Sequence, residues 1–167
     1  PRIMREALRR ARDRGVSVGA HPGYADLYGF GRRPMQLPAA EVESLILYQL
    51  GALAALARAE GMALTHVKPH GALNNQASAD PALADTVARA VAGFDAGLIL
   101  LAPVFSELAL AGHRGGVVTI DGALLPTAFH SICVHGDGPL AVQTAVALRQ
   151  ALLEQSHELL PLPALMD

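Results

Sequence analysis

GVSVGAHPGY, residues 15–24, joins a short apolar run to a histidine, a proline and a glycine. The valines of the run are β-branched, as is typical of strands, and Pro22 and Gly23 are typical of the point where a strand stops and the chain turns. The sequence therefore predicts a strand that ends near His21.

The same pattern occurs twice more along the chain. LTHVKPHGAL (64–73) leads from an apolar run to His70, and SICVHGDG (131–138) leads to His135. If the three strands are parallel neighbours, their carboxyl ends meet at one edge, where α/β sheets and barrels build their sites. We therefore expect His21, His70 and His135 to surround a common pocket.

The predicted elements alternate between helices and strands. The helices are expected at 2–14, 39–60, 81–91, 104–112 and 140–154, and the strands after the first are expected at 64–68, 97–102 and 131–135. Ile3 and Leu8 are expected on the buried face of the first helix, and a loop is expected through Asn74 and Asn75. This alternation favours parallel βα units, in an open sheet or in a barrel.

Composition narrows the class of protein. A chain of 167 residues with 51% apolar residues fits one globular domain, and a net charge of −2 argues against a nucleic-acid partner. Cys133 is the only cysteine, which excludes an intramolecular disulfide and favours a cytoplasmic location. The apolar run at 97–105 is shorter than the ~20 residues that span a bilayer, so we expect no membrane association.

The loop after the first strand is rich in groups that bind or catalyse. It contains His21, Asp26, Arg32 and Arg33 among four glycines. Paired arginines can hold a carboxylate or phosphate, and glycines let the backbone approach a ligand. The alternative is a solvated turn whose arginines neutralise nearby carboxylates. The phosphate-binding pattern GxxxxGK[ST] is absent.

Two further pairs could carry chemistry. Lys68 and His70 suggest proton transfer with charge stabilisation, although a structural salt bridge is the alternative for Lys68. His135 and Asp137 could share a proton or ligate a divalent metal, but no HExxH motif or dense cluster of ligands supports a metal.

Four segments resemble, in order, motifs of the LamB/YcsF family. They are GAHPGYADLYGFGRR (19–33), LYQLGALAALARAEG (47–61), HVKPHGALNN (66–75) and ICVHGD (132–137). The resemblance implies an ATP-dependent opening of the 5-oxoproline lactam to glutamate, carried out with the partner subunits B and C of a 5-oxoprolinase. It also implies a deformed (β/α) barrel similar to that of the glycoside hydrolase/deacetylase superfamily.

The family motifs also imply a set of site residues. The catalytic candidates are His21, Lys68, His70, His135 and Asp137, and the substrate-binding candidates are Asp26, Arg32, Arg33 and Asn75. ATP is implied as cofactor, a divalent metal is possible, and no metal ligand is assigned.

The chain departs from the family pattern in three places. Asn74 stands where the family usually has tyrosine. The family's acidic opening segment is absent before Pro1, and a segment resembling Glu-Val-Phe-Ala-Asp-Arg is absent after Gly112. We therefore expect one barrel-like domain over residues 1–167 that lacks an N-terminal segment and a segment near 112–116.

Two other functions remain open at this stage. One is a metal-dependent deacetylase or hydrolase of the same superfamily, with a metal bound by His21, His135 and a carboxylate. The other is a small-molecule-binding subunit whose partners perform the chemistry.

Overall fold

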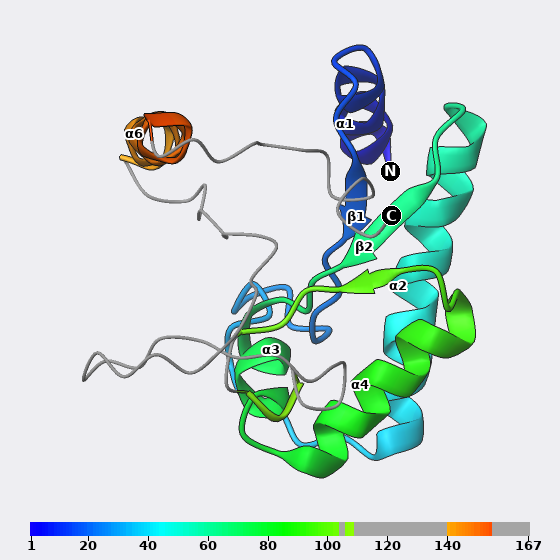
Figure 1. Cartoon of the computed structure of the whole chain (residues 1–167). Coiled ribbons are helices and arrows are strands. Elements are labelled where there is room, and N and C mark those ends of the chain that lie inside the picture. The colour runs from blue at the N-terminus through cyan, green and yellow to red at the C-terminus, as the bar shows by residue number, and fades with distance from the viewer. Residues whose placement is uncertain (104–105, 109–139, 155–167) are drawn as a thin grey trace. The chain divides into compact units, whose positions relative to one another are not determined.

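The computed structural model describes residues 1–103, 106–108 and 140–154. The chain divides into two units, Pro1–Thr127 and Ala128–Asp167, and each is described by itself. The first contains α1 (Arg2–Arg12), β1 (Val18–Ala20), α2 (Ala39–Ala59), β2 (Leu64–Val67), α3 (Gly71–Ala77), α4 (Pro81–Phe94) and β3 (Ile99–Leu100), and the second contains α6 (Ala141–Glu154) (Figure 1). The expected strand at 131–135, Cys133 and the expected gap near 112–116 lie outside the described residues.

The described strands form a parallel sheet in the order β1-β2-β3. Val67 of β2 pairs with Ala20 of β1 and with Leu100 of β3, and His66 pairs with Gly19 on one side. The predicted parallel α/β class is therefore confirmed. Three described strands do not establish closure into a barrel, and β3 is shorter than the strand predicted at 97–102.

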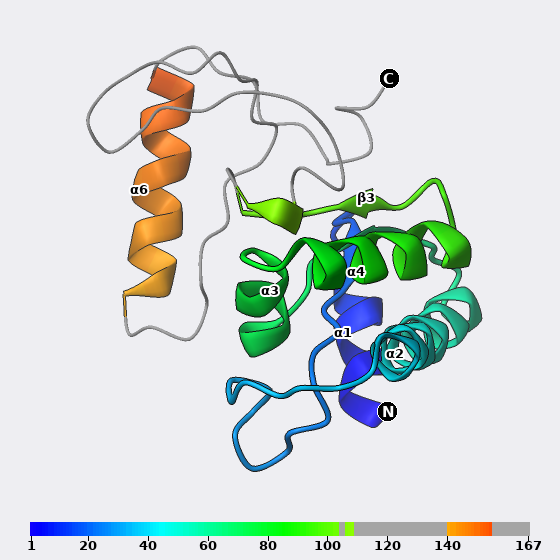
Figure 2. The ribbon, with the colours of Figure 1, turned by 90° about the horizontal axis from the view of Figure 1, so that it is seen from below.

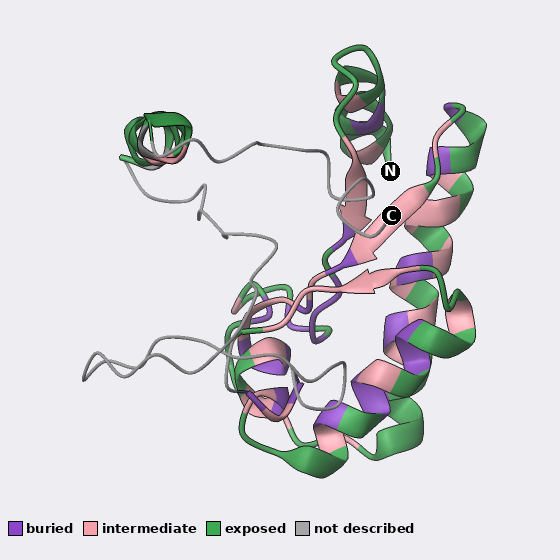
Figure 3. Cartoon of the chain, in the orientation of Figure 1, coloured by how far each residue is buried: buried purple, intermediate pink, exposed green. Residues whose placement is uncertain are grey.

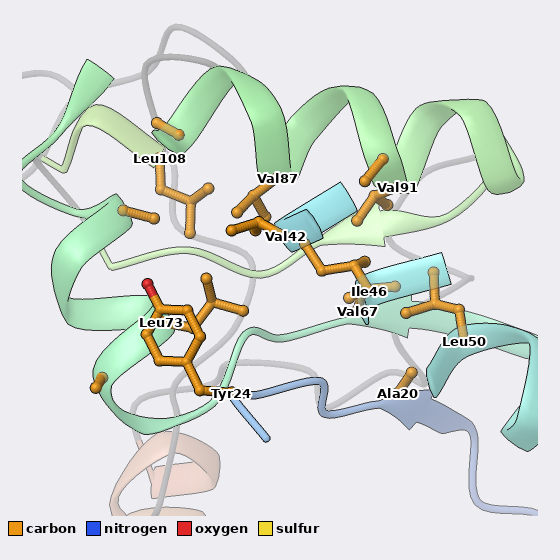
Figure 4. Packing of buried hydrophobic residues seen from close by; sticks show 14 residues of the cluster. Ala20, Tyr24, Val42, Ile46, Leu50, Val67, Leu73, Val87, Val91 and Leu108 are labelled. Carbon is orange, nitrogen blue, oxygen red and sulfur yellow. The ribbon is translucent and has the colours of Figure 1, made fainter. Parts of the chain in front are cut away.

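The core lies between the sheet and the helices α2 and α4, which lie against each other beside the sheet (Figure 2). Val42, Ile46 and Leu50 recur every four residues along α2 and form its buried stripe. The buried positions gather where the elements face one another (Figure 3). Figure 4 shows the α2 stripe packed with Val67 of β2 and with Val87 of α4, so the core covers one face of the sheet.

By length and composition alone, α2 is apolar enough to cross a membrane. That property is weak evidence for a membrane span, because core helices of soluble proteins share it. The buried stripe of α2 belongs to the core just described.

The helix ends follow local sequence signals. Gly15 and Gly61 have φ values of 63° and 73°, in the left-handed region that glycine adopts at little cost after a helix. The carboxylate of Asp80 accepts hydrogen bonds from the backbone N–H groups of Ala82 and Leu83, and caps α4 as expected.

The prediction of a loop through Asn74 and Asn75 is wrong, because these residues lie in α3. A helix of seven residues is too short to show a clear hydrophobic period, and Gly71 at its start resembles a turn signal. Tertiary contacts stabilise it: Leu73 is fully buried, and the N–H of Ala72 donates to the carbonyl of Gly31 at 2.9 Å.

The expected buried face of α1 is correct for Leu8 but wrong for Ile3, which is 78% exposed. The helix is anchored instead by its arginines, which surround the buried carboxylate of Glu60 just beyond α2. Arg5 Nε donates to Oε1 at 2.6 Å and Arg9 Nε to Oε2 at 2.8 Å. These bonds, that from Arg9 first, lower the pKa of Glu60 to about 2.

Candidate functional site

The site is built at the carboxyl ends of β1 and β2. The pairing of the two strands continues beyond their last residues, because the N–H of Lys68 donates to the carbonyl of Ala20 at 2.9 Å and that of His70 to Pro22 at 2.8 Å. His21 follows β1 directly, and Lys68 and His70 follow β2. The three side chains predicted from two separate segments therefore leave the same edge of the sheet.

His21 and His70 are in direct contact and form a histidine pair. Nε2 of His21 lies 3.0 Å from Nδ1 of His70, and the rings meet edge to face with centroids 4.7 Å apart. At the outer ends, His21 Nδ1 contacts the carbonyl oxygen of Lys68, and His70 Nε2 donates to the carbonyl of Phe30 at 2.7 Å. The convergence predicted for these two histidines is confirmed, whereas His135 lies outside the described residues.

The partners of the histidine pair determine its proton content. A carbonyl oxygen only accepts, so both outer ring nitrogens must carry hydrogen, and the central contact needs one more. Two neutral imidazoles hold two such protons, and the three hydrogen bonds require three. When all three bonds are made, the histidine pair carries one proton in excess, which it can hold and release.

Small residues explain why His-Pro-Gly follows the strand. A Cβ added to Gly23 would lie 3.2 Å from His70 Cδ2, and one added to Gly31 would lie 3.1 Å from the same atom. Gly31 also has a φ of 66°, which disfavours any other residue. Phe30 closes the far side, with its ring centroid 5.2 Å from that of His70. The glycines thus make room for the imidazole of His70.

Asp26 and Arg33, both predicted to bind substrate, bind each other. Arg33 Nε lies 2.9 Å from Oδ1 of the buried Asp26, and the Gly29 N–H donates to the same oxygen at 2.9 Å. Hydrogen bonding from Arg33 is the main reason that the pKa of Asp26 falls to about 2. This ion pair orders the loop, as the alternative interpretation from sequence had it, while a direct role in substrate binding stays a prediction.

Arg32 and Lys68 present cations near the histidine pair. The exposed Arg32 guanidinium lies 5.9 Å from the centroid of the Phe30 ring. The ammonium of Lys68 has no carboxylate partner within 4.0 Å among the residues that the structure describes, so the salt bridge considered from sequence is not found there.

Asn75 is exposed on α3 and accepts a hydrogen bond from Asn74 Nδ2 at 3.4 Å. The other polar atom of the Asn74 amide, Oδ1, is buried and has no hydrogen-bond partner within the described part of the chain. This orphaned acceptor lies at the position where the family pattern differs.

Sequence reasoning missed two glutamines that hold the loop. The amide of Gln49 on α2 accepts from the N–H of Gly23 at 3.1 Å and donates to its carbonyl at 2.8 Å. Gln76 on α3 binds both backbone groups of Met35 in the same way. A polar amide inside the apolar segment 47–61 was the available signal for Gln49.

His135 and Asp137 lie outside the described residues, so their contribution stays a prediction. Among residues 1–103, 106–108 and 140–154, no three histidine, cysteine or acidic side chains lie close enough together to hold a metal ion. The metal site considered from sequence needs His135 and is not tested by this finding.

Comparison with known proteins decides the family. The family model LamB/YcsF matches residues 1–120 and 110–167. The chain belongs to the LamB/YcsF family.

Similar proteins support this assignment. The A subunit of the 5-oxoprolinase from Azoarcus sp. (strain BH72) is 44% identical over 210 residues, which cover 98% of this chain and 82% of that protein. The corresponding A subunit from Symbiobacterium thermophilum is 51% identical over 154 residues, which cover 86% and 59%. The LamB/YcsF fold is also seen in a crystal structure of a lactam utilization protein from Thermus thermophilus, with a TM-score of 0.75 and 35% identity over 93% of this chain and 81% of that one.

Proposed function

We propose that this chain is the A subunit of a 5-oxoprolinase. In this proposal it takes part, with subunits B and C, in the ATP-dependent opening of the 5-oxoproline lactam to L-glutamate. The observation that carries it is the contact between His21 and His70 beside Lys68, in a chain 44% identical to the A subunit of a 5-oxoprolinase. A deformed (β/α) barrel and a cytoplasmic location remain part of the proposal.

The chemistry of a lactam explains what such a site must supply. An amide carbonyl is a poor electrophile, and ATP supplies a phosphoryl group that activates its oxygen. Water then adds to the carbon, the C–N bond breaks, and the nitrogen leaves with a proton. In the proposal, the histidine pair of His21 and His70 delivers the proton that it holds in excess, and Lys68 stabilises negative charge on the oxygen side.

The described residues fit a phosphate group by charge. Lys68 has no described carboxylate partner, and it stands beside the histidine pair with its positive charge. Lys68 would hold the phosphate of the activated substrate, although no nucleotide-binding motif of the P-loop type is present. Binding of ATP to this subunit, and of a divalent metal through His135 and Asp137, remain proposals.

Arg32 is proposed to hold the carboxylate of 5-oxoproline. A guanidinium can bind a carboxylate through two hydrogen bonds, and the neighbouring Arg33 is engaged with Asp26. The Asp26–Arg33 ion pair would then order the loop that carries Arg32, and Asn75 would complete the polar edge of the site.

The test is an assay of glutamate release from 5-oxoproline by the chain purified together with subunits B and C. The assay is run with and without ATP and with each subunit omitted. We expect release only in the complete, ATP-containing mixture, and its loss in the His70→Ala variant. Arg89→Ala, in an exposed ion pair with Asp85 on α4, is the matched control and should retain activity.

Other outcomes would favour the other functions. Hydrolysis by this chain alone, dependent on added metal and not on ATP, would support the metal-dependent hydrolase. Unchanged glutamate release by a folded His70→Ala variant, with 5-oxoproline still bound, would support the non-catalytic binding subunit.

A further inference from the structure

His66 lies on the face of the sheet that α2 does not cover. Successive residues of a strand point to opposite faces, and Val67 is fully buried in the core beside α2. His66 therefore points the other way, as does Lys68 two residues further along. In register, His66 stands beside Gly19 of β1 and Ile99 of β3.

The ring of His66 occupies the space above Gly19. A Cβ built on Gly19 would overlap Cγ, Cδ2 and Nε2 of that ring. Gly19 is not among the positive-φ residues described, so its backbone conformation does not call for glycine. Its small size does, because only a residue without a side chain lets the imidazole lie across β1.

Hydrogen bonding defines which ring nitrogen of His66 accepts. Thr65 Oγ1 lies 3.2 Å from the carbonyl oxygen of Val18 and 2.8 Å from His66 Nδ1. The single hydroxyl hydrogen goes to the carbonyl, so Nδ1 must donate to Thr65 and carry the ring proton. Burial lowers the pKa of His66 and favours this neutral form. Nε2 is left as an acceptor, with no partner among the described residues.

The position of His66 relates it to the rim. A strand rises ~3.3 Å per residue, so side chains two residues apart on one face are about 7 Å apart along it. His66 thus lies one layer below Lys68 and the histidine pair. In a five-membered lactam the N–H and the C=O lie on the same edge of the ring, so one edge laid along β2 can meet an acceptor and a cation together.

We propose that His66 is a positioning residue whose Nε2 accepts a hydrogen bond from the lactam N–H of the substrate, while the lactam oxygen faces Lys68. This proposal rests on the proposed function. It assigns to His66 the recognition of an amide N–H, and so the selection of a lactam over the corresponding γ-lactone, which has a ring oxygen in place of the N–H.

The experiment compares the two ring types in the assembled enzyme. It measures KM for 5-oxoproline and the inhibition constant of the γ-lactone carboxylate in wild type, His66→Phe and His66→Gln. In His66→Phe we expect KM to rise on the order of tenfold, since a buried N–H loses its acceptor, and the lactone constant to stay nearly unchanged. His66→Gln, which retains an acceptor, should restore part of the difference. Arg89→Ala should change neither constant.

A second variant guards against a folding defect. Gly19→Ala displaces the His66 ring without changing a titratable group, so it should weaken 5-oxoproline relative to the lactone in the same direction. Folding is checked by thermal unfolding and by copurification with the partner subunits. Equal changes for lactam and lactone, or no change in a folded His66→Phe enzyme, would overturn the proposal. Failure of wild type to form glutamate would instead overturn the proposed function.

Discussion

His21 Nε2 lies 3.0 Å from His70 Nδ1, although 49 residues separate the two histidines in the sequence. Each ring is also held by a backbone carbonyl on its outer side. The two imidazoles therefore form one hydrogen-bonded unit that shares three protons.

Removal of either histidine should disable the unit. His70→Ala and His21→Ala should each lower kcat of the assembled enzyme on the order of 10² or more, the usual scale for loss of an acid or base. The double variant should be little worse than either single one, because groups that act as a unit are not additive. Steady-state kinetics of all three variants measure this, and losses that multiply would show that the histidines act independently.

Lys68 and Arg32 should differ in the kinetic constant that they affect. Lys68→Ala should mainly lower kcat, on the order of 10², because its cation meets charge that develops in the transition state. Arg32→Ala should mainly raise KM, because a carboxylate is held equally before and during the reaction. A near-normal kcat in a folded Lys68→Ala enzyme would contradict the role given to Lys68.

Arg33 should act on stability before it acts on substrate. Arg33→Ala would leave the buried Asp26 carboxylate without its main partner, so the loop should loosen and the melting temperature should fall. Asp26→Asn combined with Arg33→Ala should recover part of the loss, since the unpaired charge is gone. Calorimetry of the single and double variants checks this, and no recovery would indicate that Arg33 stabilises the loop in another way.

Two depressed carboxyl pKa values should make the fold sensitive to acid. Asp26 and Glu60 each have a pKa of about 2 in the folded chain, below their ordinary values of 3.8 and 4.5. Protons bind the unfolded chain first, so the stabilisation is present above about pH 4.5 and is lost as the pH falls toward 2. Urea unfolding at a series of pH values should show this loss.

Glu60→Gln supplies the control for the acid effect. It should be less stable near neutral pH, because Arg5 and Arg9 lose their charged partner, and its stability should fall less between about pH 4.5 and 2 than that of the wild type. Parallel curves for the two proteins would show that Glu60 does not contribute to the acid sensitivity.

Much of the architecture was predictable because its signals are local. Alternating apolar runs and helical periods predicted the parallel α/β class, and Asp80 before Pro81 predicted the start of α4. The strand followed by histidine, proline and glycine also predicted that His21 and His70 would share one edge of the sheet. Each of these features depends on residues close together in the chain.

Tertiary structure decided what depends on distant contacts. Arg32 and Arg33 are equivalent in the sequence, and only the fold brings the buried Asp26 to Arg33. Helix α3 is stabilised by burial and by a bond to the loop at Gly31, which no seven-residue pattern reveals. The contact of His21 with His70 needs the register of β1 on β2 and the space left by glycines. Register and packing arise from the whole chain, so they are absent from any single stretch of it.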